Sequence, residues 1–207
     1  CLVGSEMCIR DRFNKEYSAV TFTEPLPENI RPGHLIAADE PGPDVHISGC
    51  RMSGNRARGL LIGSRGRVII ENNYFHIAGA SILFEGDGNF WFEQSGVRDV
   101  TIRNNIFANG NYGSRGWGSA CIAVGSGISQ RQTSRYHRNI QVDGNLFRVF
   151  DPRIVNLYCV DGFQFSASNR IVRTSDYPAT FDPKLHFVFD QCDHIEIPRQ
   201  IEMAEQR

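Results

Sequence analysis

The chain has 207 residues, of which 22 are basic and 23 acidic, for a formal net charge of −1, and 41% of its residues are apolar. These values are typical of one compact domain and argue against a nucleic-acid partner, which requires clustered Lys and Arg. The one dense basic stretch, residues 131–138, is interrupted by Gln, Thr, Ser and Tyr, so we interpret it as a solvated loop. No apolar run approaches the length of a bilayer-spanning helix, and no membrane span is predicted.

The N-terminal part of the chain differs from the rest. Residues 1–12, CLVGSEMCIRDR, resemble a translated sequencing-adapter tail, so we treat them as non-native and expect the chain to be a fragment. Residues 13–44 alternate like a strand, turn between Pro25 and Pro32, and alternate again, which predicts the tail of a separate small β-element that leads into the following coils. Coils of a solenoid are predicted over residues 45–197, followed by a C-terminal tail at 198–207.

A degenerate phrase, Val-x-Ile-x-x-Asn-x-Phe, recurs along the coils. It reads VHISGCRM, VIIENNYF, VTIRNNIF, IQVDGNLF, FQFSASNRI and IEIP, beginning at residues 45, 68, 100, 140, 163 and 195. The shortest spacing occurs twice, from 45 to 68 and from 140 to 163, and the longer spacings indicate insertions into the same basic unit. A basic period in the twenties, with apolar residues alternating within each phrase, is typical of a parallel β-helix. The predicted fold is therefore all-β, with a second strand after each corner at residues 58–63, 80–87, 120–127, 154–162 and 186–192.

The sixth residue of each phrase marks the predicted corner. These residues are Cys50, Asn73, Asn105, Asn145 and Ser168. In stacked turns they lie above one another, and a ladder of side-chain amides would satisfy buried polar groups. We interpret the Asn residues as structural.

Neither cysteines nor histidines predict a metal site. The six cysteines show no C-x-x-C pair, and Cys50, Cys121 and Cys159 lie within or beside repeat strands, where small core residues are expected. The histidines share no ligand spacing, so no metal site is predicted.

Several longer motifs resemble one enzyme family. NRARG, IENNYFH, EGD and VRDVTIRNN, within residues 53–113, together with residues 146–165, resemble the C-terminal part of the right-handed β-helix of glycoside hydrolase family 110, the bacterial α-1,3-galactosidases. Residues 20–33, VTFTEPLPENIRPG, resemble the end of the β-barrel insertion of these enzymes, which makes residues 13–44 the end of a small β-barrel-like insertion. The resemblance implies an inverting exo-hydrolase that acts without a cofactor on glycans with terminal α-galactose. It also implies a periplasmic or secreted parent, whereas the sequence itself leaves the compartment unknown.

The catalytic residues are not assigned by this sequence. In the family, the main catalytic aspartates include an adjacent Asp-Asp pair on coils before the barrel insertion, and this chain has no such pair. Inversion requires one carboxylic acid and one carboxylate on opposite faces of the sugar. The chain by itself is therefore predicted to be inactive.

Six residues are candidate substrate contacts. Glu85 and Asp87 are predicted to face outward with Leu83, where they either bind sugar hydroxyls or serve as a turn signature and a backbone or arginine partner. Arg56 and Arg58 either pair with these carboxylates or reach the sugar. Trp91 and Trp117 are the aromatic candidates for stacking on galactose, while Phe90 and Phe92 are better explained as a hydrophobic lid.

Two other classes of protein stay open. A different β-helix polysaccharide-degrading enzyme is one, although the Asn-Thr-Asp, Asp-Asp and Gly-His-Gly signatures of a polygalacturonase and the acidic calcium cluster of a pectate lyase are not visible. A non-catalytic carbohydrate-binding or structural solenoid is the other, because repeats provide long ligand surfaces without chemistry.

Overall fold

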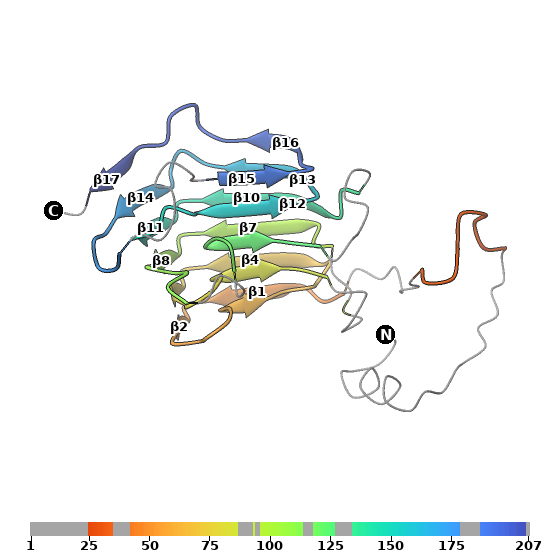
Figure 1. Ribbon diagram of the computed structural model, residues 1–207, viewed down its shortest axis with the longest axis horizontal. Helices are drawn as coiled ribbons and strands as arrows, with labels where there is room; N and C mark the ends of the chain where they lie inside the picture. The colour runs from red at the N-terminus through yellow and green to blue at the C-terminus, as the bar shows by residue number, and fades with distance from the viewer. Residues whose placement is uncertain are drawn as a thin grey trace.

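The protein is a parallel β-helix made of three sheets (Figure 1). The computed structural model describes residues 25–34, 42–86, 93, 96–113, 118–126, 134–178 and 187–205. In this part of the chain all regular structure is β, and every pair of neighbouring strands is parallel. The all-β parallel β-helix predicted from the repeat is confirmed.

Each coil contributes one strand to each sheet. Sheet A contains, in order, β1 (Val45–Ser48), β4 (Arg67–Glu71), β7 (Asp99–Arg103), β10 (His137–Asp143), β13 (Val160–Phe165) and β16 (Asp193–Glu196). Sheet B contains β2 (Arg51–Ser53), β5 (Tyr74–His76), β8 (Ile106–Ala108), β11 (Leu146–Val149), β14 (Arg170–Arg173) and β17 (Met203–Glu205). Sheet C contains β3 (Leu60–Leu61), β6 (Ile82–Phe84), β9 (Ile122–Val124), β12 (Val155–Tyr158) and β15 (Phe187–Asp190).

The first apolar residue of each sequence phrase pairs with the first apolar residue of the next. Val45 pairs with Val68, Val68 with Val100, and Val100 with Ile140. Because side chains alternate along a strand, this register sends one set of residues from every coil into the interior. Within it, the rings of Phe75, Phe107 and Phe147 stack with centroids 5.1 and 4.7 Å apart.

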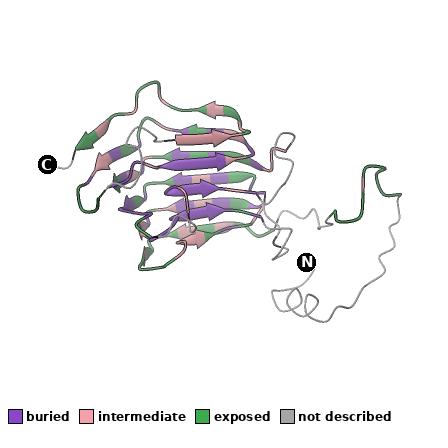
Figure 2. Ribbon diagram, in the orientation of Figure 1, coloured by how far each residue is buried: buried purple, intermediate pink, exposed green. Residues whose placement is uncertain are grey.

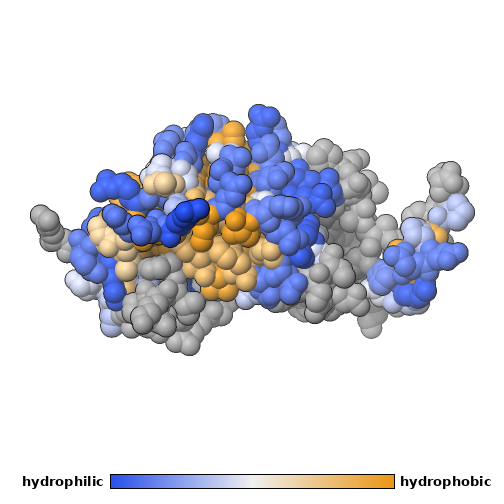
Figure 3. Space-filling view, turned by 90° about the horizontal axis from the view of Figure 1, so that it is seen from above, coloured by the Kyte–Doolittle hydropathy of each residue, from blue (hydrophilic) through white to orange (hydrophobic). Residues whose placement is uncertain are grey.

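Burial is deepest in the middle coils and decreases toward both ends of the stack (Figure 2). At the last coil, apolar residues that pack against the core are only partly buried, and from above they form an apolar centre surrounded by polar side chains (Figure 3). They include Phe187, Phe189, Ile195, Ile201 and Met203. The core is thus a continuous apolar column through the coils.

The corner between sheets A and B is tight and has nearly the same length in every coil. Gly49, Asn72, Asn104 and Gly144 hold left-handed backbone there, with φ between 55° and 68°. Asn and Gly tolerate this conformation better than other residues, which explains why they occupy the corner. The bend expected after each strand is confirmed.

An asparagine ladder follows this bend. The Asn105 Oδ1 accepts hydrogen bonds from the backbone N (2.9 Å) and Nδ2 (3.0 Å) of Asn73, and the Asn145 Oδ1 accepts from Asn105 in the same way. The next member is Asn169, whose Oδ1 accepts from Asn145, so the prediction of Ser168 was wrong. This corner holds one extra residue, which moves Ser168 out of the ladder position.

The cysteines follow the prediction in part. Cys121 and Cys159 are buried as predicted, but Cys50 is exposed, because no described strand covers the outer side of the first coil. Strand β17 pairs with β14, so the coils continue to Glu205 beyond the boundary expected at residue 197. Of the β-barrel-like insertion, the structure describes turns within residues 25–34, and the strands expected on either side lie outside the described residues.

Candidate functional site

The connections that border sheet C vary greatly in length. Between paired core positions of sheets C and A, residues 60–68 and 155–163 form short segments, whereas residues 82–100 and 122–140 form segments more than twice as long. The two long connections belong to neighbouring coils, because they leave sheet C from the adjacent strands β6 and β9. Lengthened loops on a rigid scaffold are where binding sites are usually built.

The other border of sheet C also carries long connections. Between paired core positions of sheets B and C, the segments 107–122 and 171–187 are each more than twice as long as the segment 75–82. Nearly all of the inserted length inferred from the repeat spacing therefore occurs at the two corners that border sheet C. The corner between sheets A and B receives a single extra residue, before Asn169.

The outer face of sheet C is largely covered. Leu61, Leu83, Ala123, Asn156 and Val188 form one outward row, because each pairs with the next across neighbouring strands. Leu83 was predicted to face solvent, but it is 9% exposed and packs with Ala80 and Ala123 in a cluster separate from the main core. It does point away from the core, but the outer face is itself covered there.

Glu85 is exposed at the end of β6, as predicted. It is aligned with Gly125 on the next coil, since Phe84 pairs with Val124, and Gly125 N donates to Phe84 O (2.8 Å). A Cβ placed on Gly125 would lie 3.2 Å from Glu85 Oε1. The carboxylate of one long connection therefore lies against the backbone of the other, and glycine provides the room.

His137 holds the other side of Gly125. Its ring is fully buried, and Nε2 lies 2.7 Å from Gly125 O. A carbonyl only accepts, so Nε2 carries the hydrogen and Nδ1 is the unprotonated nitrogen of the neutral ring. Burial lowers the pKa of His137 to about 4, although the Gly125 carbonyl acts in the opposite direction. At neutral pH an uncharged imidazole thus anchors the backbone beneath Glu85.

Buried polar atoms gather around sheet C. Among the described residues, four buried side-chain atoms have no hydrogen-bond partner: Ser81 Oγ, Ser126 Oγ, His137 Nδ1 and Asn156 Oδ1. Ser81 precedes β6, Ser126 follows β9, His137 is the first residue of β10, and Asn156 lies on the outer row of β12. Buried polar groups usually have hydrogen-bond partners. Among the described residues, the buried polar atoms that lack one are therefore found around sheet C.

The predicted arginines lie on the opposite border of sheet C from Glu85. Leu60 pairs with Ile82, which aligns Arg58 with Ala80, about 16 Å of strand before Glu85. The pairing of these arginines with Glu85 or Asp87, and their contact with a sugar, stay predictions.

The remaining predicted residues, Asp87, Trp91 and Trp117, lie outside the described residues. In the chain, Asp87 and Trp91 fall between β6 and β7, and Trp117 between β8 and β9, so all three belong to long connections that border sheet C. Their contacts with a substrate stay a prediction. Sequence reasoning missed Gly125 and His137, since their importance depends on which strands become neighbours.

Within the residues that the structure describes, no group of three or more His, Cys, Asp or Glu side chains is arranged to hold a metal ion. The same residues include no helix long and apolar enough to cross a membrane.

The fold and its borders define a class of protein: a β-helical solenoid whose long connections surround one sheet. No protein-family model matches the chain. It is 39% identical over 168 residues to "Alpha-1,3-galactosidase A" of Shewanella woodyi, an alignment that covers 81% of this chain and 27% of that protein. It is 35% identical over 189 residues to "Alpha-1,3-galactosidase B" of Bacteroides thetaiotaomicron, covering 90% and 31%, respectively.

A third relative, "Alpha-1,3-galactosidase B" of Akkermansia muciniphila, is 30% identical over 187 residues, which cover 89% of this chain and 23% of that protein. The chain thus spans less than a third of the length of these relatives. Homology to proteins named α-1,3-galactosidase extends over most of the chain and supports the resemblance noted from its motifs. The assignment to glycoside hydrolase family 110 stays a prediction.

Proposed function

We propose that this chain is the β-helical part of an inverting exo-α-1,3-galactosidase, and that its substrate contacts the border of sheet C at Glu85. The observation that carries the proposal is the position of Glu85, an exposed carboxylate where two long connections of neighbouring coils meet. The homology to α-1,3-galactosidases indicates the substrate class, a glycan with terminal α-galactose.

In this proposal, the residues of this chain bind and orient the sugar. The exposed carboxylate of Glu85 accepts hydrogen bonds from sugar hydroxyls, and such bonds to a charged group contribute about 1.5 to 3 kcal/mol each. Gly125 leaves space for the carboxylate, and the neutral His137 ring fixes the Gly125 carbonyl from inside. Arg56, Arg58, Asp87, Trp91 and Trp117 are proposed as further contacts from the same two borders.

The proton transfers are assigned to residues of a longer parent protein. Inversion requires an acid and a base roughly 6.5 to 9.5 Å apart, with a water molecule between the base and the sugar. The proposal supplies both groups from coils that precede this part in the relatives, which are more than three times as long as the aligned region. The 207-residue chain alone is then inactive. In this proposal, the reaction of the parent uses neither a metal nor an organic cofactor.

The first experiment compares the chain with its parent. We expect the isolated chain to release no nitrophenol from nitrophenyl α-galactoside, and the full-length parent to hydrolyse Galα1,3Gal. Proton NMR should show β-galactose as the first product. Appearance of α-galactose first would contradict the inverting mechanism, and an inactive parent that still binds the disaccharide would favour the non-catalytic carbohydrate-binding alternative.

The second experiment tests the site. Replacing Glu85 by Gln in the parent should lower kcat/KM for Galα1,3Gal about 10- to 100-fold, because a charged acceptor becomes a neutral amide. Glu202→Gln is the matched control, since Glu202 is an exposed carboxylate at the corner between sheets A and B. Equal kinetics for the two variants would remove Glu85 from the site and leave the enzyme class untouched.

A further inference from the structure

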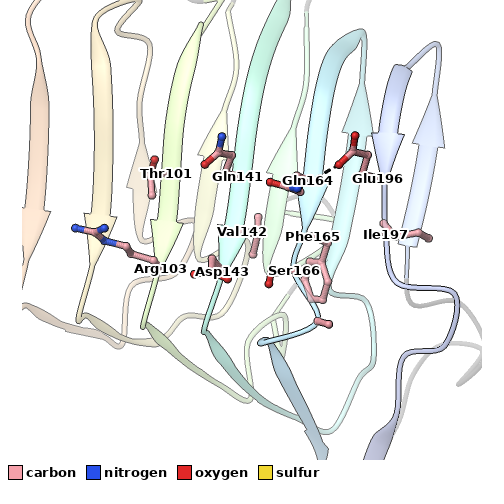
Figure 4. A pocket seen from close by; sticks show the side chains of 11 residues that line it. Thr101, Arg103, Gln141, Val142, Asp143, Gln164, Phe165, Ser166, Glu196 and Ile197 are labelled. Carbon is pink, nitrogen blue, oxygen red and sulfur yellow. Dashed lines mark hydrogen bonds between the residues drawn. The ribbon is translucent and has the colours of Figure 1, made fainter.

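A second polar surface lies on the outer face of sheet A, whereas the proposed galactosidase site borders sheet C. A groove of about 590 Å³ runs across β7, β10, β13 and β16 (Figure 4). This volume lies within the range of roughly 300 to 1,000 Å³ that is usual for small-ligand sites. Its walls are side chains carried mainly by strands, so the groove is built on the most rigid part of the fold.

Two rows of polar side chains line the groove. Thr101, Gln141, Gln164 and Glu196 form the first row, each in register with the next across neighbouring strands. Arg103, Asp143 and Ser166 form a second row next to it (Figure 4). Strands of a sheet are about 4.8 Å apart, so the first row offers one polar group per coil at a regular interval along the helix axis.

The second row is held in place by its neighbours. Arg103 Nε donates to Glu71 Oε2 (2.6 Å), and Glu71 Oε1 also lies 2.8 Å from His46 Nε2. Ser168 Oγ donates to Asp143 Oδ1 (2.5 Å), and the hydroxyls of Ser168 and Ser166 lower the pKa of Asp143. Asp143 therefore remains a charged acceptor, and the one arginine among the described lining residues already has a carboxylate partner.

The first row keeps hydrogen-bonding capacity for a ligand. Gln164 Nε2 donates to Glu196 Oε2 (3.1 Å), which uses one amide hydrogen and leaves its Oε1 and second N–H. Gln141 is exposed and offers two donors and an acceptor from the centre of the groove. Amides that both donate and accept match hydroxyl groups, which do the same.

The charges of the groove exclude several ligands. Asp143 and Glu196 are not balanced by Arg103, because Glu71 already neutralises it, so a phosphate or sulfate would meet net negative charge. Nucleic acid is disfavoured for the same reason. A neutral ligand rich in hydroxyl groups, long enough to cross several coils, remains.

We propose that this groove binds a neutral oligosaccharide laid along the helix axis, with successive sugars contacting Thr101, Gln141, Gln164 and Glu196. The surface is separate from the border of sheet C and does not require galactosidase activity. It would hold a glycan chain on the protein independently of its terminal sugar.

NMR spectroscopy of the isolated chain tests the groove directly. On titration with β-1,4-linked galactotetraose, a neutral oligosaccharide, the side-chain amide resonances of Gln141 and Gln164 should shift and saturate. The double variant Gln141→Ala/Gln164→Ala should bind at least tenfold more weakly, since it loses two amide partners. Both residues are exposed on strands, and an unchanged thermal transition will show that the variant folds.

The matched control is Gln191→Gly, which removes an exposed glutamine between β15 and β16, outside the groove, tolerates the left-handed backbone of that position (φ 54°), and should leave the affinity unchanged. Tetragalacturonate, a charged tetrasaccharide, should bind more weakly than galactotetraose. The proposal is overturned if the two amides do not shift, if the double variant binds normally, or if the charged ligand binds more tightly. None of these probes carries terminal α-1,3-galactose, so their results are distinguishable from failure of the proposed function.

Discussion

The corner between sheets A and B and the corners that border sheet C obey opposite rules. At the first, the spacing of paired core residues is constant through four coils and grows by a single residue in the last two, and a left-handed residue precedes an asparagine ladder. At the others, the connection ranges from the short segment 75–82 to the long segments 82–100 and 122–140. One side of the helix maintains the stack, and the other accepts insertions.

The difference has a physical origin. A ladder amide contacts the coil before and the coil after, so a change in corner length that moved this amide would misplace two neighbours at once, and the one extra residue of the last two coils leaves Asn169 in the ladder. A connection that leaves the sheet can lengthen at little cost, because loop-closure entropy grows slowly with length. Function is therefore expected where the fold permits variation, and Glu85 lies there.

The largest effect is expected from breaking the ladder at its centre. Asn105→Ala leaves the backbone N and Nδ2 of Asn73 without their acceptor, and the carbonyl of Ile70 without a donor. Buried unpartnered groups cost about 1 to 3 kcal/mol each, so we expect a loss of about 3 to 5 kcal/mol in the free energy of unfolding. Urea denaturation followed by circular dichroism measures it.

The control for this variant is the adjacent residue. Asn104 has φ 55° and is exposed, so Asn104→Gly keeps the left-handed bend and should change stability by less than about 1 kcal/mol. If the two variants were equally stable, the ladder would not be what maintains this corner.

In the region that borders sheet C, the neutral ring of His137 predicts that the free energy of unfolding depends on pH. Its pKa is about 4 when folded, below the ordinary value of 6.5, so between these values the unfolded chain binds a proton that the folded chain does not. Stability contributed by His137 is complete above pH 6.5 and is lost as pH falls toward 4, by up to about 3 kcal/mol.

The measurement is a series of urea denaturations between pH 7 and pH 4, on the protein and on His137→Gln. Glu71, Asp143 and Asp193 also have lowered pKa values, and their acid-dependent losses are common to both proteins. The difference between the two curves isolates the histidine. Parallel curves would show that folding does not lower the pKa of His137, which would contradict a ring kept neutral by burial.

The smallest effect concerns the first rung. Cys50 occupies the ladder position, and its backbone N already donates to Asn73 Oδ1 (2.9 Å). Cys50→Asn should add a side-chain donor to the same oxygen and raise stability by up to about 1 kcal/mol. Thermal denaturation provides the readout, with Cys50→Ala as the control that removes the thiol without adding an amide. A variant no more stable than this control would mean that the ladder requires a coil on both sides.

Much of the scaffold was predictable. The phrases beginning at Val45, Val68, Val100 and Ile140 are in register, because alternating apolar residues must all face one interior. The last ladder residue was misplaced, since a one-residue insertion between Phe165 and Asn169 leaves no trace in the strand pattern. The spacing of the phrases gives the total length inserted into a coil, but it does not show how that length is shared between the two borders of sheet C.

The candidate site was predictable in part. An exposed Glu85 follows from the alternation of β6, but its distance from Arg58 depends on which end of a strand each residue occupies. The roles of Gly125 and His137 arise from contacts between coils that are far apart in the chain.

The sequence by itself determined the parallel β-helix, its period and its asparagine corner, because these depend on residue types repeated at a local spacing. Only the tertiary structure decided that every long connection borders sheet C, that a glycine and a buried histidine support Glu85, and that glutamines of successive coils align on sheet A. Such features depend on register between coils, which is set by the packing of the whole stack.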